Sequence, residues 1–190
     1  MGYKTMDANE AVSRVSYKFT EIAGIYPITP ASPMAEKVDV LASKGEINFW
    51  GNKVKVIEME SEKGAIATVH GALQAGVLAT TYTASQGLLL MIPSIYKMAG
   101  EMLPGVIHVA ARSLSTHSLS IFGDHQDIYA VRQTGACMLS SSSVEEAYHM
   151  AMVSHLASIK SSLPFINFFD GFRTSHEIDK VKEVDLSRLE

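Results

Sequence analysis

The hydrophobic pattern alternates between short apolar, mostly β-branched runs and longer stretches whose apolar residues recur at helical spacing. A short strand is predicted within 24–30, and further strands are predicted to start at residues 53, 77, 106, 136 and 165. Successive starts from residue 53 onward are 24, 29, 30 and 29 residues apart, and each interval holds one helical segment. This regular alternation predicts an α/β fold, a doubly wound and mostly parallel sheet with helices on both faces.

Local signals mark the predicted helix starts, and the helices are expected at 7–23, 32–45, 61–75, 88–102 and 143–160. Asp7 and Ser143 are each followed three residues later by a glutamate, which is the capping-box pattern. Ser32 is the expected N-cap of the second helix, with proline in its first turn. Pro93 predicts either a kink or a late first turn in the fourth.

Charge is distributed unevenly over the 190 residues. The net charge is −4, yet residues 64–144 contain only six charged side chains, whereas the rest of the chain carries 30. So long a charge-poor stretch fits two situations, the centre of a sheet covered by helices or a surface that faces another protein. We expect both to apply.

Composition excludes several classes of protein. A nucleic-acid-binding domain usually carries a basic stripe, and this chain has none. Its longest apolar run, 88–92, stops at Pro93 and is far shorter than the ~20 residues of a membrane span. The single cysteine, Cys137, cannot form an internal disulfide or ligate an iron–sulfur cluster by itself, so a reducing cytoplasmic location is expected.

The C-terminal residues differ from the rest of the chain. Residues 176–190 include eight charged side chains in fifteen positions and few turn signals. We therefore expect one domain over 1–175, followed by a charged linker over 176–190 that leads toward a further domain outside this chain.

Parallel sheets bind ligands beyond the carboxyl ends of their strands. Three residues with useful chemistry follow predicted strands: Thr29 between two prolines, Glu62 at the start of a small-residue helix, and Arg112. Arg112 can grip a carboxylate with two parallel hydrogen bonds. The alternative is an internal salt bridge from Arg112 to Asp124 or Asp127.

Two weaker patterns leave alternatives open. Ser85 lies between a predicted strand and helix in a sequence that resembles a nucleophile elbow, and Asp124 and His125 could complete a serine hydrolase triad. The other interpretation of Ser85 is a helix N-cap. Asp124, His125 and Asp127 could bind a metal, but a loop whose side chains satisfy its own backbone is the better interpretation.

Six segments in register resemble the N-terminal domain of pyruvate:ferredoxin (flavodoxin) oxidoreductases. They are Tyr26–Pro30, Glu58–Glu62, Thr83–Met91, His108–Arg112, Ile121–Asp127 and Phe169–His176. The resemblance covers essentially the whole chain. It implies a thiamine diphosphate-binding fold in which residues 1–175 hold the pyrimidine side of the cofactor.

The resemblance also implies an activity for a several-fold longer enzyme. Members of this family cleave pyruvate with coenzyme A to acetyl-CoA and carbon dioxide and pass electrons to ferredoxin or flavodoxin. We expect a cytoplasmic homodimer that uses thiamine diphosphate, Mg²⁺ and [4Fe-4S] clusters. No metal is expected on this chain, because the magnesium-diphosphate segment and the cluster cysteines would belong to other domains of the polypeptide.

Site residues follow from the same resemblance, motif by motif. Glu62 is expected to contact the aminopyrimidine ring of the cofactor, with Ile28 and Thr29 also beside it. Thr29 and Arg112 are expected to bind pyruvate, Arg112 through the carboxylate, and Ile121 to line the pocket.

The chemistry of thiamine agrees with a glutamate at position 62. Its amino group must act as a base in the imino form, and a carboxylate bonded to the opposite ring nitrogen favours that form. The alternative for Glu62 is an acid favoured by the helix dipole alone. A non-catalytic binding or assembly module of the same fold is the alternative for the whole chain. On either interpretation the isolated chain is expected to be inactive.

Overall fold

The computed structural model describes residues 2–189, so Met1 and Glu190, the ends of the two expected ranges, lie outside it. Six strands form one sheet in the order β3-β2-β4-β5-β7-β6, and every neighbouring pair is parallel. The strands are β2 (Ile22–Ile25), β3 (Lys55–Glu58), β4 (Ala79–Thr83), β5 (Val106–Ala111), β6 (Cys137–Ser141) and β7 (Phe165–Asp170). The predicted parallel α/β sheet is confirmed.

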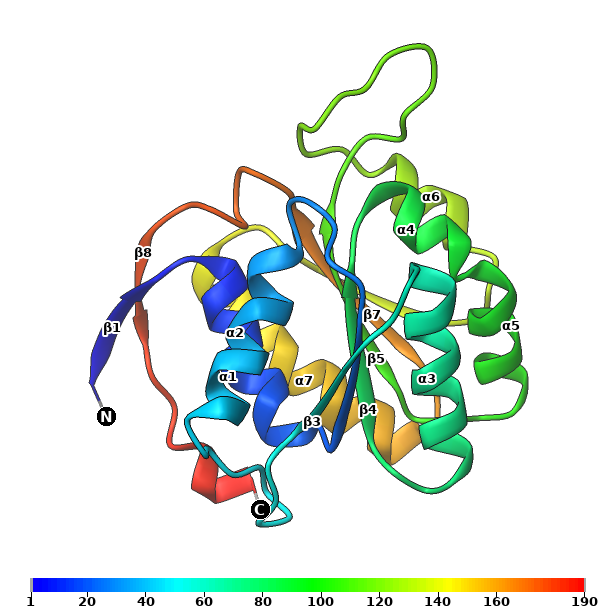
Figure 1. Ribbon diagram of the computed structural model, residues 1–190. Coiled ribbons are helices and arrows are strands. Elements are labelled where there is room, and N and C mark those ends of the chain that lie inside the picture. The colour runs from blue at the N-terminus through cyan, green and yellow to red at the C-terminus, as the bar shows by residue number, and fades with distance from the viewer. Residues whose placement is uncertain (1, 190) are drawn as a thin grey trace.

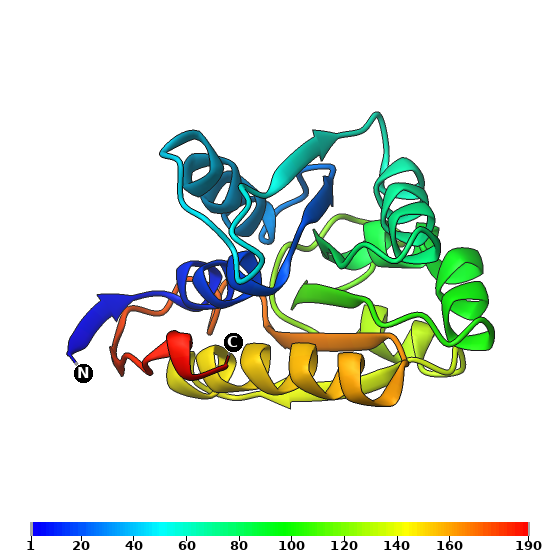
Figure 2. The same ribbon diagram turned by 90° about the horizontal axis from the view of Figure 1, so that it is seen from below.

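Helices cover both faces of this sheet, as Figures 1 and 2 show. One face carries α1 (Ala8–Phe19), α2 (Ser32–Ser43) and α7 (Val144–Ser161). The other face carries α3 (Glu62–Gln74), α4 (Ser85–Leu90), α5 (Ile92–Gly100) and α6 (Gln126–Val131). Two apolar clusters, one on each side of the sheet, form the core. The arrangement explains why all six residues of β5 are buried, since strands covered on both faces read as continuous apolar runs.

The predicted helix starts are mostly confirmed. Asp7 caps α1 by accepting from the amide of Glu10, and Ser143 caps α7 by accepting from the amide of Glu146. Ser32 is not the cap of α2: Ala31 occupies that position, and Ser32 is already helical. The predicted helix at 88–102 is two helices that meet at Met91, with Pro93 in the first turn of α5. Pro93 therefore begins a helix, because its missing amide needs no partner there.

Four elements were not predicted. Strand β1 (Tyr3–Met6) pairs antiparallel with β8 (Asp179–Lys182), which lies within the expected linker (Figure 1). Val181 of β8 is fully buried, so part of that segment packs onto the domain. A 3₁₀ helix follows at Leu186–Leu189. The fourth, α6, has only six residues and carried no periodic signal.

Within the described residues, no helix is both long and apolar enough to cross a lipid bilayer.

A row of buried polar side chains crosses the sheet beneath α1 and α7. Tyr82, His108 and Asn167 occupy matching register positions on β4, β5 and β7. A nitrogen of Asn167 lies 3.1 Å from Nδ1 of His108, and Nε2 of His108 lies 3.1 Å from Nε2 of His155 on α7. The Tyr82 hydroxyl lies 2.8 Å from that of Ser16 on α1. These bonds satisfy most of the polar groups of the row, while Oδ1 of Asn167 has no partner among the described residues.

The two histidines of this row are buried, so desolvation disfavours their charged forms. Burial lowers the pKa of His155 to about 3, and burial together with the neighbouring His155 lowers the pKa of His108 well below its ordinary value. In the unfolded chain both groups bind protons near pH 6.5. The unfolded state therefore binds more protons, and stability falls as the pH drops from about 6.5 toward 3.

We predict that His155→Gln reduces the dependence of the melting temperature on pH between pH 7 and 4.5, because one buried proton-binding difference is removed. His149→Gln, on the same helix but outside the row, is the matched control and should keep the wild-type slope. The measurement is thermal unfolding followed by circular dichroism across this pH range. An unchanged slope in His155→Gln would contradict the prediction, whatever its absolute stability.

Candidate functional site

The three principal site residues lie at one edge of the sheet, beyond the carboxyl ends of its strands. Thr29 lies in the loop after β2, Glu62 begins α3 just after β3, and Arg112 directly follows β5. Because β2, β4 and β5 are adjacent and parallel, their carboxyl ends face the same side. The topology thus brings the loop after β2 and the end of β5 to the same edge as Glu62.

A direct hydrogen bond joins Thr29 and Arg112. The guanidinium Nη1 of Arg112 donates to the carbonyl oxygen of Thr29 at 2.7 Å. The Thr29–Pro30 peptide bond is cis, and the carbonyl of Pro30 accepts a hydrogen bond from the buried side chain of Asn9 on α1. Thr29 itself is exposed, and its hydroxyl makes no hydrogen bond among the described residues. The loop backbone is therefore anchored while the Thr29 hydroxyl stays available.

Arg112 is nearly buried, with 8% of its surface exposed. Burial lowers the pKa of its guanidinium, and the nearby Asp127 carboxylate partly offsets this effect. Its Nε is buried and has no partner within residues 2–189. Nη1 donates to a backbone carbonyl, and Asp127 accepts from the backbone amide of Arg112. Among residues 2–189 the guanidinium therefore forms no salt bridge with Asp124 or Asp127. A cationic group with spare donors suits an anionic ligand.

Glu62 is the first residue of α3 and is only 8% exposed. Ser61 caps the helix by accepting from the amide of Gly64, and the helix N-terminus favours the negative charge that follows it. The carboxylate makes no hydrogen bond or ion pair with any other described residue. The carboxylate is therefore available to a ligand that reaches the helix N-terminus.

The Glu62 side chain packs closely against α4. A Cβ added to Gly87 would lie 2.8 Å from Cγ and 2.9 Å from Oε1 of Glu62, and 2.5 Å from the hydroxyl of Thr83. Only glycine fits there without moving the carboxylate. The Thr83 hydroxyl is also buried and has no hydrogen-bond partner among residues 2–189. Sequence reasoning missed this contact, because nothing in the local pattern around residue 87 points to residue 62.

Asp127 binds three backbone amides and is fully buried. Its Oδ2 accepts from Ser85 at 2.8 Å and from Arg112 at 3.0 Å, and its Oδ1 accepts from Ile128 at 2.8 Å. Burial raises the pKa of this carboxyl, and the three amides oppose that shift. The sequence indicated a loop whose side chains satisfy its own backbone, which holds for Asp124 with the amide of Gln126 and for Asp127 with the amide of Ile128. The two long-range amides that Asp127 also binds had no signal in the sequence.

Ile28 and Ile121 occupy different environments. Ile28 is partly buried and packs against the core cluster on the α1 side of the sheet. Ile121 is 43% exposed on the loop between β5 and α6. The loop is closed beside Arg112, because the amide of Ser113, the next residue, donates to the carbonyl of Phe122. The described contacts do not join either isoleucine directly to Glu62.

The hydrolase arrangement is not assembled. Ser85 Oγ is buried and lies 2.7 Å from the carbonyl oxygen of Ser113, while His125 pairs with Asp170 at 2.7 Å. Asp124 accepts from the amide of Gln126. Ser85 is not the N-cap of α4 either, because Ala84 occupies that position. Among residues 2–189 no three His, Cys, Asp or Glu side chains are grouped to hold a metal ion.

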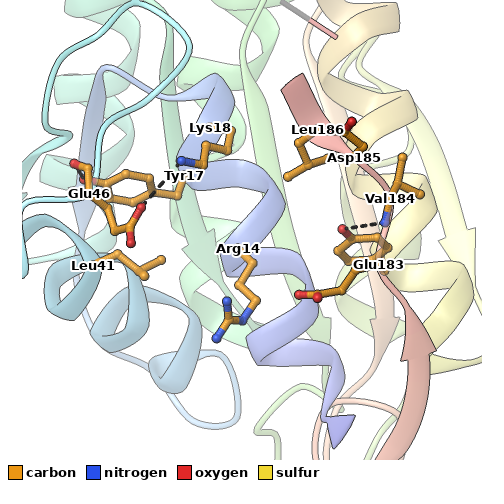
Figure 3. Close-up of a pocket in the computed structure, with 10 residues that line it drawn as sticks. Arg14, Tyr17, Lys18, Leu41, Glu46, Glu183, Val184, Asp185 and Leu186 are labelled. Carbon is orange, nitrogen blue, oxygen red and sulfur yellow. Dashed lines mark hydrogen bonds and ion pairs between the residues drawn. The ribbon is translucent and has the colours of Figure 1, made fainter. Parts of the chain in front are cut away.

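Two pockets lie outside this set of residues. One of about 300 Å³ is bounded by Arg14, Tyr17 and Lys18 of α1 and by the segment 183–186 (Figure 3). Tyr17 and Lys18 lie in the last turn of α1, a few residues before β2 begins at Ile22, so this pocket is near the amino ends of the strands. A second, of about 290 Å³, is lined by the His125–Asp170 pair and residues 140–142 and opens at the carboxyl edge.

Comparison with known proteins identifies the family. Residues 14–190 match the family model described as pyruvate flavodoxin/ferredoxin oxidoreductase, thiamine diphosphate-binding. The chain is 61% identical over 186 residues to a pyruvate-flavodoxin oxidoreductase of Klebsiella pneumoniae, and the matched region covers 98% of this chain and 16% of that protein. It is 58% identical over 185 residues to a pyruvate:ferredoxin oxidoreductase of Moorella thermoacetica, where the match covers 97% of this chain and 16% of that protein.

A solved structure shares the fold. The 2-oxoglutarate:ferredoxin oxidoreductase of Magnetococcus marinus, solved with 2-oxoglutarate, coenzyme A and succinyl-CoA bound, superimposes with a TM-score of 0.80 at 23% identity. The match covers 94% of this chain and 31% of that one. Together with the family model and the high identities, the fold leads to one conclusion: this chain belongs to the pyruvate flavodoxin/ferredoxin oxidoreductase family and is its thiamine diphosphate-binding N-terminal domain.

Proposed function

We propose that this domain supplies the pyrimidine side of the thiamine diphosphate site in an enzyme that oxidatively decarboxylates pyruvate. The chain spans only 16% of the two relatives described above, so the activity belongs to a longer polypeptide. The observation that carries the proposal is the hydrogen bond from the Arg112 guanidinium to the carbonyl of Thr29. Arg112 is buried, and its Nε has no partner among the described residues. This geometry leaves donors for a substrate carboxylate at the edge where Glu62 also lies.

The residues present fit the cofactor. Glu62 is a buried carboxylate that lacks a hydrogen-bond partner among residues 2–189, and an aminopyrimidine ring offers a ring nitrogen that can share a proton with it. Gly87 leaves the Glu62 carboxylate just enough room on the α4 side. When bound, thiamine diphosphate supplies a carbanion that adds to the 2-oxo carbon of the substrate. Ile28 provides a partly buried wall beside the Thr29 loop.

Each polar residue then has one task. Glu62 holds a proton at the pyrimidine ring nitrogen, and its partial burial strengthens that hydrogen bond. Arg112 orients pyruvate through its carboxylate. The unpartnered hydroxyl of Thr29 donates to the 2-oxo oxygen. Ile121 closes the pocket from the loop after β5.

The remaining parts of the reaction lie outside this chain. We propose that coenzyme A accepts the acetyl group, that carbon dioxide leaves, and that the electrons pass through [4Fe-4S] clusters to ferredoxin or flavodoxin. Mg²⁺ and the cofactor's diphosphate would be held by another domain of a cytoplasmic homodimer. The names of the relatives support the acceptors, and the coenzyme A bound in the Magnetococcus marinus structure supports the acyl acceptor.

We predict that Glu62→Gln in the full-length enzyme lowers kcat about 100-fold or more, because the amide cannot hold the proton that the pyrimidine needs. Glu60→Gln is the matched control: Glu60 is exposed two residues away, and its rate should stay within about twofold of wild type. The assay follows pyruvate-dependent reduction of a viologen dye. A Glu62→Gln rate within about twofold of wild type would show that the assigned role is wrong.

We predict that Arg112→Ala raises the KM for pyruvate about tenfold or more, because a charge-assisted hydrogen bond to the substrate is lost. Arg132→Ala is the control, since Arg132 also donates Nη1 to a backbone carbonyl, that of Tyr129, but is exposed on the surface. Steady-state kinetics with varied pyruvate measure both. An unchanged KM for pyruvate in Arg112→Ala would show that Arg112 does not bind the substrate carboxylate.

We predict that Gly87→Ala weakens thiamine diphosphate binding about tenfold, because the new methyl group displaces the Glu62 carboxylate. Gly71→Ala, in the exposed part of α3 with no atom within 4 Å of the added Cβ, should leave binding unchanged and stabilise the helix by about 0.5–1 kcal/mol. Titration of the apoenzyme with the cofactor gives both dissociation constants. Equal dissociation constants for thiamine diphosphate in Gly87→Ala and Gly71→Ala would show that the packing of Gly87 against Glu62 does not affect cofactor binding.

A further inference from the structure

We propose that Asp127 is the positioning residue that holds the substrate side and the cofactor side of this site in register. The inference deepens the proposed function and rests on it. It begins from a group that the reaction does not use directly: a fully buried carboxylate with no ligand role assigned to it. All three of its hydrogen bonds go to backbone amides.

The first link runs to the substrate side. Oδ2 of Asp127 accepts from the amide of Arg112 at 3.0 Å, at the position where β5 ends and sheet hydrogen bonding stops. The Arg112 backbone is therefore fixed from one side by Asp127, while its guanidinium is held from the other by the Thr29 carbonyl. Two fixed points define the direction in which the remaining donors face.

The second link runs to the cofactor side. The same Oδ2 accepts from the amide of Ser85 at 2.8 Å, the residue that turns from β4 into α4 with a φ of +49°. A non-glycine residue with positive φ is disfavoured unless its surroundings hold it. Two residues later comes Gly87, against which the Glu62 carboxylate packs. Asp127 thus fixes the start of the helix that limits where Glu62 can lie.

One oxygen atom therefore couples two strand ends. Hydrogen bonds to a charged acceptor are stronger than neutral ones, and a carboxylate can accept several at once. Asparagine has nearly the same shape but offers only one acceptor oxygen, and its NH₂ group would face an amide donor. Asp127→Asn must therefore leave at least one of the three amides without a partner. If the NH₂ group replaces Oδ2, the amides of Arg112 and Ser85 lose their acceptor, and if it replaces Oδ1, the amide of Ile128 does.

The test uses the full-length holoenzyme with Asp127→Asn, and Asp124→Asn as the control. Asp124 lies in the loop just before α6, the helix that contains Asp127, and accepts from one local amide, that of Gln126. We expect Asp127→Asn to raise both the KM for pyruvate and the dissociation constant of thiamine diphosphate about tenfold, which corresponds to about 1.4 kcal/mol each. Asp124→Asn should change neither by more than about twofold.

A purely structural role would give a different result. The variant would then show a lower melting temperature and fewer active molecules, but the KM and the dissociation constant of the active fraction would match wild type, and this outcome would overturn the proposal. Inactive wild-type and Asp124→Asn enzymes would instead refute the proposed pyruvate oxidation. The two failures are therefore distinguishable.

A double-mutant cycle tests whether Asp127 acts through Arg112. If it does, Asp127→Asn should raise the pyruvate KM by less than about twofold in an Arg112→Ala background, because the group being positioned is absent. Fully additive effects would contradict the coupling. Should Asp127→Asn fail to fold, hydrogen exchange of the wild-type enzyme remains decisive: slow exchange at the amides of Ser85 and Arg112 supports the bridge, and rapid exchange at either amide refutes it.

Discussion

The ends of the parallel strands impose the constraint on which the whole site depends. Between β4, β5 and β7 the backbone groups pair along the ladder, but beyond Thr83 and Ala111 the strands end and the amides that follow need other acceptors. Asp127 provides an acceptor for both strand ends, and the Thr29 carbonyl provides one for the Arg112 side chain. The groups that satisfy the backbone are thus the same groups that shape the candidate ligand-binding edge.

This constraint also explains the sparse charges between residues 64 and 144. Most of that stretch forms β4, β5 and the helices that cover one face of the sheet, where an unpaired charge would be costly to bury. Two of its six charges, Arg112 and Asp127, are buried all the same, and both lie at the carboxyl edge. They are tolerated there because backbone carbonyls and amides solvate them in place of water.

The sheet was predictable, and the main candidate site residues could be proposed, because both rest on local patterns. Continuous apolar strands, capping residues such as Asp7 and Ser143, and motifs in register each leave a signal within a few residues. The pairing of β1 with β8 left none, since only Met6 and Val181 are buried there. The approach of Gly87 to Glu62 and the reach of Asp127 to Ser85 depend on how distant segments pack, and no local pattern encodes them.

The buried row beneath α1 and α7 has a further consequence for proton placement. Asn167 directs its amide nitrogen at Nδ1 of His108, so that ring nitrogen must accept and the proton of His108 lies on Nε2. His108 then donates to Nε2 of His155, whose own proton is left on Nδ1. The tautomers of the two rings are therefore correlated, and reversing the Asn167 amide would reverse both. The positions of the ring protons on β5 and α7 are therefore set together by the orientation of one amide on β7.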